Sequence, residues 1–354
     1  MAFRLLAINP GSTSTKVALF QDEILQFEET IIHSVEQLKK YENLWDQFDL
    51  RKDAVLKFLD KNGINISHLS AVVGRGGLIK PIPGGTYLVN EEMIHDAKIG
   101  VQGVHAANLG CAIAKSIADK IGVSAYVVDP IAVDEFEPLA RYSGHPLIER
   151  RALSHTLNIH AVGRMAADKL AVEYEDTNFI VAHLGGGISI CPLKKGRIVD
   201  VNDASSSGPF SPERTGELPL QPFIKLCFSG KFTQDEMRKL VMGKGGITAY
   251  LNTTDALEVE RRINEGDAKA KEVYQAMAYQ VSKEIGAMAT VINGDVRAIV
   301  ISGGLAKSEM LIEWIKERVN FIAEVIVMPG EFEMIALARG VLRILRNEEE
   351  AKKY

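Results

Sequence analysis

The 354-residue sequence has little of several features that would mark particular classes of protein. It has three cysteines, Cys111, Cys191 and Cys227, which lie far apart, so neither a disulfide framework nor a zinc site is indicated. No apolar run approaches the roughly 18 to 20 residues that cross a bilayer. The first residues lack the apolar core and cleavage site of a signal peptide. The sequence therefore predicts a cytoplasmic protein with buried, reduced thiols and no membrane partner.

Basic runs are also missing, and the formal net charge is −5. Binding to nucleic acid by neutralising its phosphates is therefore not expected. The eight histidines show no HExxH spacing, so a structural metal is not expected either. With 46% hydrophobic and 25% charged residues the composition is that of a globular protein, and the length suffices for two domains.

Several common catalytic motifs are absent. The sequence contains no Walker A motif GxxxxGK[ST], no GxGxxG and no GxSxG nucleophile elbow. Thr13 and Lys16 share the spacing of a Ser-x-x-Lys pair, but the first residue is Thr, and the SDN and KTG partners are missing. Covalent catalysis by a hydroxyl group is therefore not indicated.

The segment Leu5 to Phe20, LLAINPGSTSTKVALF, predicts a hairpin with an unusually polar turn. Two apolar runs flank Asn9, Pro10, Gly11, four consecutive hydroxyl residues and Lys16. A tight hairpin needs only about two or three turn residues. Such residues are typical of exposed turns, but a glycine-rich turn with hydroxyls and a lysine also offers donors to an anion. This stretch alone leaves both interpretations open.

The two halves of the chain are built alike. A second strand, glycine turn and strand occupies residues 178–200, and AVVGRGGL (71–78) matches AIVISGGL (298–305) at five of eight positions. Helical patterns fill the gaps, and they lie at residues 50–63, 105–122, 267–292 and, behind a Thr233/Glu236 capping box, 234–243. A duplicated hairpin-plus-α/β unit predicts two similar domains with mixed sheets covered by helices and a cleft between them.

Three glycine turns follow predicted strands, at residues 9–14, 185–187 and 303–305. The third precedes a predicted helix, whose N-terminal N–H groups and dipole favour an anion. Each turn alone is a weak signal. Three of them in a duplicated α/β frame indicate nucleotide phosphates.

The motifs together resemble those of the acetate and butyrate kinase family, which belongs to the actin/hexokinase/Hsp70-like superfamily of duplicated ribonuclease H-like domains. The resemblance spans about residues 5–343 and rests on INPGSTSTK, GRGGL, VVDP, AHLGGGISI, GPFSPERTGELP and ISGGLAKSEM, in that order. Acetate kinases typically read NAGSSSxK, HRVVHGG and HLGNG, so the details here are most similar to butyrate kinases. The asparagine of HLGNG is Gly186 in this chain.

The resemblance implies a reversible phosphoryl transfer from ATP to the carboxylate of a short-chain acid such as butyrate, giving an acyl phosphate and ADP, with Mg²⁺ and in a homodimer or higher homo-oligomer. It implies an N-terminal lobe of residues 1–140 with 335–354, a lobe of residues 141–334 that binds nucleotide, and an active-site cleft between them. Alternatives are an acetate or propionate kinase of the same family, a sugar kinase, or a non-catalytic actin-like nucleotide-binding protein.

The resemblance also implies roles for individual residues. Arginine offers forked donors and a permanent charge, which suit a phosphoryl group in transit, and an acid at a strand end suits a ligand site in an α/β sheet. The expected catalytic residues are Arg75, Asp129, His155 and Arg214. The expected phosphate and nucleotide contacts are Asn9, Ser12, Ser14, Lys16, His183, Gly185, Gly186, Gly187, Asp255, Gly303 and Gly304.

The acid pocket and the metal site complete these expectations. Gly77 and Ser154 are small, and with His105 they are expected to line a pocket roomy enough for a propyl or isopropyl group. Glu333 is expected near Mg²⁺ together with Asp129, with Glu331 as the rival. Mg²⁺ takes few protein ligands and keeps waters and phosphates, so one or two carboxylates suffice.

Overall fold

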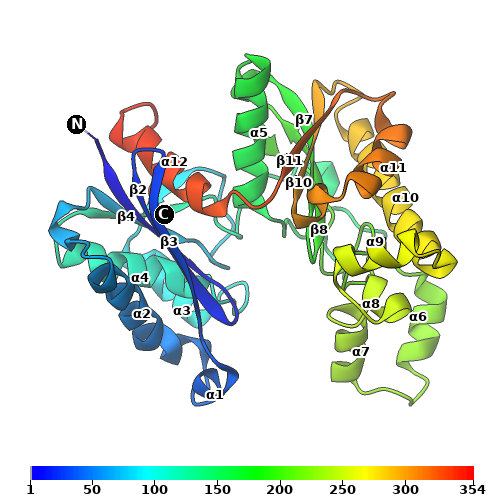
Figure 1. Cartoon of the computed structure of the whole chain (residues 1–354), viewed down its shortest axis with the longest axis horizontal. Coiled ribbons are helices and arrows are strands. Elements are labelled where there is room, and N and C mark those ends of the chain that lie inside the picture. Colours follow the sequence, from blue (N-terminus) through cyan, green and yellow to red (C-terminus); the bar gives the residue numbers. More distant parts are fainter. Residues whose placement is uncertain (1) are drawn as a thin grey trace. The chain divides into compact units, whose positions relative to one another are not determined.

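The computed structural model describes residues 2–354 and divides the chain into two compact units (Figure 1). Unit 1 comprises the residues up to Asp134 together with Phe332–Tyr354, and unit 2 comprises Glu135–Glu331. No helix within residues 2–354 is long and apolar enough to cross a membrane.

Unit 1 is built on a six-stranded mixed sheet in the order β3-β2-β1-β4-β6-β5. The first three strands form an antiparallel meander, and β4 and β6 lie parallel to β1. The strands are β1 (Arg4–Pro10), β2 (Ser14–Gln21), β3 (Ile24–Ile32), β4 (Ala71–Arg75), β5 (Thr86–Leu88) and β6 (Ser124–Val128).

Helices cover both faces of this sheet, with α2 and α4 on one face and α12 on the other (Figure 1). The core between the sheet and α2 and α4 is apolar, and Ile8, Val17, Val55 and Ile113 are fully buried in it. The helices of unit 1 are α1 (Val35–Leu38), α2 (Phe48–Lys61), α3 (Glu91–Ile99), α4 (Asn108–Asp119) and α12 (Glu333–Leu345), with 3₁₀ turns η1 (Leu44–Gln47) and η2 (Ile66–His68).

Unit 2 has a five-stranded sheet in the order β11-β10-β7-β8-β9. Helix α5 covers one face, and α10, with α11 packed beside it, covers the other (Figure 1). The strands are β7 (Asn178–Leu184), β8 (Ile188–Lys194), β9 (Arg197–Ile198), β10 (Ala298–Gly303) and β11 (Val325–Pro329). The helices are α5 (Thr156–Leu170), α6 (Leu220–Cys227), α7 (Gln234–Val241), α8 (Gly246–Leu251), α9 (Ala256–Asn264), α10 (Ala268–Val291) and α11 (Glu309–Val319), with 3₁₀ turns η3 (Pro138–Arg141), η4 (Tyr174–Asp176) and η5 (Gly304–Lys307).

The two sheets repeat one topology, which confirms the predicted duplication. In β3-β2-β1-β4-β6 and in β9-β8-β7-β10-β11, a meander of three strands is followed by two parallel strands on the other side of the first. The matching octapeptides contain β4 and β10, which hold the same place in the two sheets. The Thr233/Glu236 capping box is present at the start of α7. Cys111 and Cys191 are buried, but Cys227 is only half-buried because α6 buries none of its residues.

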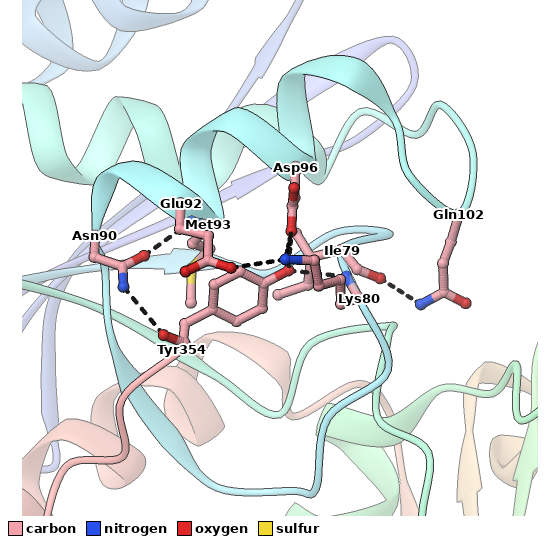
Figure 2. A network of polar contacts seen from close by, with 8 residues as sticks. All are labelled: Ile79, Lys80, Asn90, Glu92, Met93, Asp96, Gln102 and Tyr354. Atoms are coloured by element: carbon pink, nitrogen blue, oxygen red, sulfur yellow. Dashed lines mark hydrogen bonds and ion pairs between the residues drawn. The ribbon is translucent and has the colours of Figure 1, made fainter.

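The segment that follows α12 is tied to unit 1 by a polar network (Figure 2). The hydroxyl of Tyr354 donates to Oδ2 of Asp96 at 2.7 Å and accepts the N–H of Lys80 at 2.9 Å. The Lys80 ammonium also pairs with Asp96 at 3.1 Å. Two residues earlier, the N–H of Lys352 donates to the carbonyl of Thr86, and its carbonyl accepts the N–H of Leu88, both on β5. The tail thus extends the sheet edge and locks onto α3.

We expect Tyr354→Phe to lower the free energy of unfolding of unit 1 by about 1–3 kcal/mol, because a buried carboxylate and a backbone N–H each lose a partner. Urea denaturation followed by circular dichroism measures the change. Tyr142→Phe, on an exposed side chain, is the control. Equal midpoints for wild type and Tyr354→Phe would show that the network does not stabilise the unit.

Candidate functional site

Three predicted site residues of unit 1 lie at the carboxyl ends of neighbouring parallel strands. Ile8 pairs with Gly74 and Arg75 pairs with Val128, so Asn9, Arg75 and Asp129 follow one another along one edge of the sheet. Ligands of α/β sheets gather at this edge. The register therefore brings together residues that lie 120 positions apart, between Asn9 and Asp129 in the sequence.

An ion pair joins this edge to the start of α12. Nη1 of Arg75 lies 2.7 Å from Oε1 of Glu333, and Nδ2 of Asn9 donates to Oε2 of the same carboxylate at 2.6 Å. Nη1 of Arg75 also makes a longer contact of 3.4 Å with Oδ1 of Asn9. Both charged side chains are mostly buried, which strengthens their attraction relative to a surface pair. The guanidinium is thus held at the strand ends by protein partners.

The charges of both members of this ion pair act on the pKa of His105. Burial lowers the pKa of His105, the positive charge of Arg75 lowers it further, and Glu333 opposes them. Nδ1 of His105 also accepts the N–H of Ala107 at 3.1 Å, ahead of α4. His105 is therefore a neutral imidazole at pH 7 beside the Arg75 guanidinium.

Asp129 follows β6 in the sheet, and hydrogen bonds to the backbone of Gly85 also hold it in place. It adopts a left-handed conformation with φ +39°, which is uncommon for a residue other than glycine. Its Oδ1 accepts the N–H of Gly85 at 2.6 Å, and its own N–H donates to the carbonyl of Gly85 at 3.0 Å. This reciprocal pair offsets the strain and fixes the loop before β5 next to Asp129.

The polar hairpin presents different residues to the two faces of the sheet. Lys16 pairs with Asn9 across the β1–β2 ladder, so their side chains share a face, whereas Thr15 points to the opposite face and is fully buried. Ser12 is exposed at the turn, and Ser14 is half-buried. The ammonium of Lys16 lies 3.1 Å from Glu28, a partly exposed ion pair that a ligand can displace at little cost.

The structure shows why residue 77 is a glycine, and the reason is not the size of a pocket. A Cβ at Gly77 would overlap the side chain and backbone of Asn108 at the start of α4. Oδ1 of Asn108 accepts the N–H of Leu78 at 2.9 Å, and this bond depends on the close approach. The space that the missing side chain leaves is therefore filled by Asn108, so the sequence argument that Gly77 adds room for the acid does not hold.

In unit 2 a hydrogen-bonded cluster lies at the carboxyl ends of β7 and β10. His183 pairs with Ser302 across the parallel strands. Nδ2 of Asn158 lies 2.8 Å from Nδ1 of His183 and 3.0 Å from Oγ of Ser302, and all three side chains are buried. An amide on α5 thus fixes the orientation of His183.

His155 joins the same cluster. It immediately precedes α5, and its Nδ1 lies 2.9 Å from Oγ of Ser189 on β8. The rings of His155 and His183 lie 4.3 Å apart between centroids. Since Asn158 is one helical turn beyond His155, both project from the same side of α5 toward the sheet.

Arg214 packs against the glycine turn between β7 and β8. A Cβ at Gly187 would overlap the guanidinium of Arg214, so a side chain there would displace the guanidinium from its present position. Nη1 of Arg214 donates to the carbonyl of Ala204 at 3.1 Å, and Oγ of Ser211 donates to the carbonyl of Gly186 at 2.5 Å. Nε of Arg214 is buried and finds no hydrogen-bond partner among the described residues. A buried donor of this kind is costly without an acceptor.

The remaining predicted residues of unit 2 lie in varied settings. Gly303 has φ +93°, and a Cβ there would overlap the carbonyl of Leu184. Gly304 opens η5 and has free space beside it. Asp255 is exposed and caps α9 by accepting the N–H of Leu257 at 2.9 Å, which is a structural role. Gly185 and Ser154 are half-buried, whereas Glu331 is exposed.

Sequence reasoning missed the residues that orient the histidines. Asn158, Ser189 and Ser302 belong to no motif that carries chemistry by itself. The spacing of three between His155 and Asn158 was the available signal for the first of them, because residues three apart share one face of a helix. The other two depend on which strand ends meet, which is a property of the folded sheet.

The chain is similar in sequence to proteins of one family. The model of the Acetokinase family matches residues 142–325. Butyrate kinase 2 of Clostridium acetobutylicum is 52% identical over 355 residues, which cover 100% of both chains.

Solved structures show the same fold. An acetate kinase of Porphyromonas gingivalis has a TM-score of 0.79 and 18% identity, over 97% of this chain and 100% of its own. A propionate kinase of Francisella tularensis subsp. tularensis SCHU S4 has a TM-score of 0.75 and 16% identity, over 96% and 98%. At these identities the likeness concerns the fold alone, and it confirms the predicted α/β class with duplicated domains.

The environment of His105 can be tested through its titration. Arg75→Gln removes a charge that lowers the pKa of His105, so we expect that pKa to rise, whereas Glu333→Gln should lower it. NMR titration of the ring protons measures both shifts. Arg339→Gln, also in α12 but paired with Glu23 at the surface, should leave the pKa unchanged. Shifts in the same direction for both site variants would refute the described charge arrangement.

Proposed function

The chain belongs to the Acetokinase family, and from that premise we propose that it is a butyrate kinase. It transfers the terminal phosphoryl group of ATP to the carboxylate of a short-chain acid, giving an acyl phosphate and ADP, and it runs in both directions. The single observation that carries the assignment is the 52% identity to a butyrate kinase over the full length of both chains.

The charges of the candidate site suit this reaction. A carboxylate must approach a phosphoryl group of the same sign, so catalysis consists of positioning and charge neutralisation. Arg75 and Arg214 supply permanent charge with planar, forked donors. Each is fixed by protein contacts, and Nε of Arg214 keeps a donor without a partner in the described chain. Such preorganised donors stabilise charge that develops in a transition state.

We assign the carboxylate of the acceptor acid to charged residues of unit 1, and the phosphates of the nucleotide to residues of the glycine-bearing hairpins. In unit 1, Arg75 and neutral His105 face the carboxylate, and the oxygens of Asp129 and Glu333 order the donors around it. In unit 2, His155 and His183 donate to phosphate oxygens, and Arg214 binds the phosphoryl group in transit. The proposed phosphate contacts are Asn9, Ser12, Ser14 and Lys16 in unit 1 and Gly185, Gly186 and Gly187 in unit 2. Gly303, Gly304 and Asp255 remain candidates for the adenosine.

Mg²⁺ is the proposed cofactor, and it neutralises phosphate charge when bound. The described residues hold no group of three or more His, Cys, Asp or Glu side chains that could bind a metal by themselves. This fits an ion that arrives with the nucleotide and takes only one or two protein carboxylates. Glu333 and Asp129 are the carboxylates at the site. Glu333 is favoured over Glu331 because it lies beside Arg75 and Asn9.

The choice among acids depends on the volume beside the acyl chain. Ser154 is the remaining small residue proposed to admit a propyl or isopropyl group, since Asn108 fills the space at Gly77. Each buried methylene contributes about 0.8 kcal/mol, so preference among neighbouring acids is several-fold. Acetate or propionate kinase activity is the alternative within the family. The cytoplasmic location and the homo-oligomer also stay predictions.

Trapping of the acyl phosphate by hydroxylamine, as an acyl hydroxamate, tests the function directly. We expect ADP and an acyl hydroxamate to form from ATP, Mg²⁺ and butyrate, and rates on acetate, propionate, isobutyrate and isovalerate to rank the acids. No acyl phosphate from any acid of this series would reject the proposal.

Arg75→Ala should lower kcat by roughly 10² or more, by analogy with the loss of one preorganised donor. Arg339→Ala, which removes a surface arginine of the same unit, is the matched control and should retain normal turnover. A kcat of Arg75→Ala within threefold of the control would remove Arg75 from the mechanism.

A further inference from the structure

Arg51 on α2 is a fully buried arginine without an acidic partner. It is 0% exposed, and none of the described carboxylates makes an ion pair with it. Its guanidinium donates only to neutral oxygens. A buried charge without partners strongly destabilises the folded protein. A buried arginine without a carboxylate must therefore donate many hydrogen bonds to neutral acceptors.

The oxygens that Arg51 contacts belong mainly to the turn of the polar hairpin. Nη1 donates to the carbonyl of Gly11 at 2.9 Å, to the carbonyl of Ser14 at 2.7 Å and to Oγ1 of Thr15 at 3.2 Å. Nη2 donates to the carbonyl of Ser12 at 3.1 Å. The remaining donations, from Nε at 3.1 Å and Nη2 at 3.0 Å, go to Oε1 of Gln47, the residue before α2.

The remaining carbonyl of the turn, that of Thr13, is also hydrogen-bonded. The carbonyl of Thr13 accepts the N–H of His33 at 2.8 Å, and Nε2 of His33 lies 2.8 Å from Oγ1 of Thr15. The four consecutive carbonyls from Gly11 to Ser14 are therefore all bonded to Arg51 or His33. The carbonyl oxygens of the turn therefore point toward the protein interior.

Peptide geometry determines where the donors of the turn point. In a trans peptide the C=O of one residue and the N–H of the next point in opposite directions. Since the carbonyls of Gly11 and Ser12 face Arg51, the N–H groups of Ser12 and Thr13 face away from it. Neither N–H bonds to another described residue, and both side chains are exposed. The turn thus offers donors to solvent while its acceptors are hidden, which is the arrangement of an anion-binding nest.

The charge behind the turn has the sign that an anion requires. Burial lowers the pKa of Arg51 from its ordinary value, but a guanidinium remains protonated at pH 7. Burial and the charge of Arg51 lower the pKa of His33, so the imidazole stays neutral. The other side chains facing the guanidinium, Thr15 and Gln47, carry no charge. One uncompensated positive charge therefore lies beneath the turn.

We infer that Arg51 is a positioning residue for the polyphosphate of the nucleotide, acting through the hairpin turn without touching the ligand. It holds the turn with its donors outward and adds a buried positive charge, which a phosphate at the turn offsets. This inference rests on the proposed function for the nature of the anion, but the arrangement of the turn does not depend on which acid accepts the phosphoryl group.

Arg51→Met and Arg51→Lys test the inference, with Arg262→Met as the matched control. Arg262 is a partly buried arginine of unit 2 that bonds Asp267 and the carbonyl of Leu251, so its loss has a structural cost of the same kind. We expect Arg51→Met to raise the KM for ATP at least tenfold and the KM for butyrate less than threefold. Arg51→Lys, which keeps the charge but not the fork, should fall between Arg51→Met and wild type. Arg262→Met should leave both KM values within threefold of wild type.

Two further readouts keep the inference separate from the proposed function. Calorimetric titration with Mg·ATP measures the dissociation constant without turnover, so it tests Arg51 even if no acyl phosphate forms. Hydrogen exchange of the peptide spanning the turn should be faster in both Arg51 variants than in Arg262→Met. If Arg51→Met does not fold, Arg51→Lys and Gln47→Leu, which removes the acceptor of two guanidinium bonds, carry the test. Unchanged ATP affinity in folded Arg51 variants would overturn the inference.

Discussion

The proposed chemistry depends on guanidinium groups that protein contacts fix in place while some of their N–H donors stay available to a ligand. Arg214 shows this most directly, because Gly187 and the carbonyl of Ala204 fix its position and its buried Nε finds no partner in the described chain. Arg75 is fixed by Glu333 and Asn9. Two anions can react only if their repulsion is offset, and fixed donors do so without reorganising during the reaction. The strand ends, the glycine turns and the helix starts of both units serve to place these groups.

The sequence predicted the parts that periodicity and motifs encode. Alternating apolar runs gave the hairpin of β1 and β2, and the octapeptide match gave β4 and β10 equivalent places in two sheets. The strand-end rule placed Arg75 and Asp129 at one edge, and the register of β4 and β6 confirms it. The roles of these residues came from family resemblance, and the roles themselves stay predictions.

The sequence could not reveal contacts that exist only after the chain folds. Gly77 was interpreted as room for substrate, whereas its missing Cβ makes space for Asn108. Arg51 lies in the helix predicted at residues 50–63, but its bonds to carbonyls some 40 positions earlier leave no trace in the helical pattern. Asn158 and Ser302 meet because the first turn of α5 lies at the carboxyl ends of β7 and β10. In each case the deciding partner is backbone or a neutral side chain, which no motif records.

A crystal structure of the protein with a non-hydrolysable ATP analogue, Mg²⁺ and butyrate tests the central claim most directly. We expect a phosphate oxygen within hydrogen-bond distance of Nε of Arg214, about 2.7 to 3.2 Å. A bound nucleotide whose phosphates leave this Nε without an acceptor would contradict it.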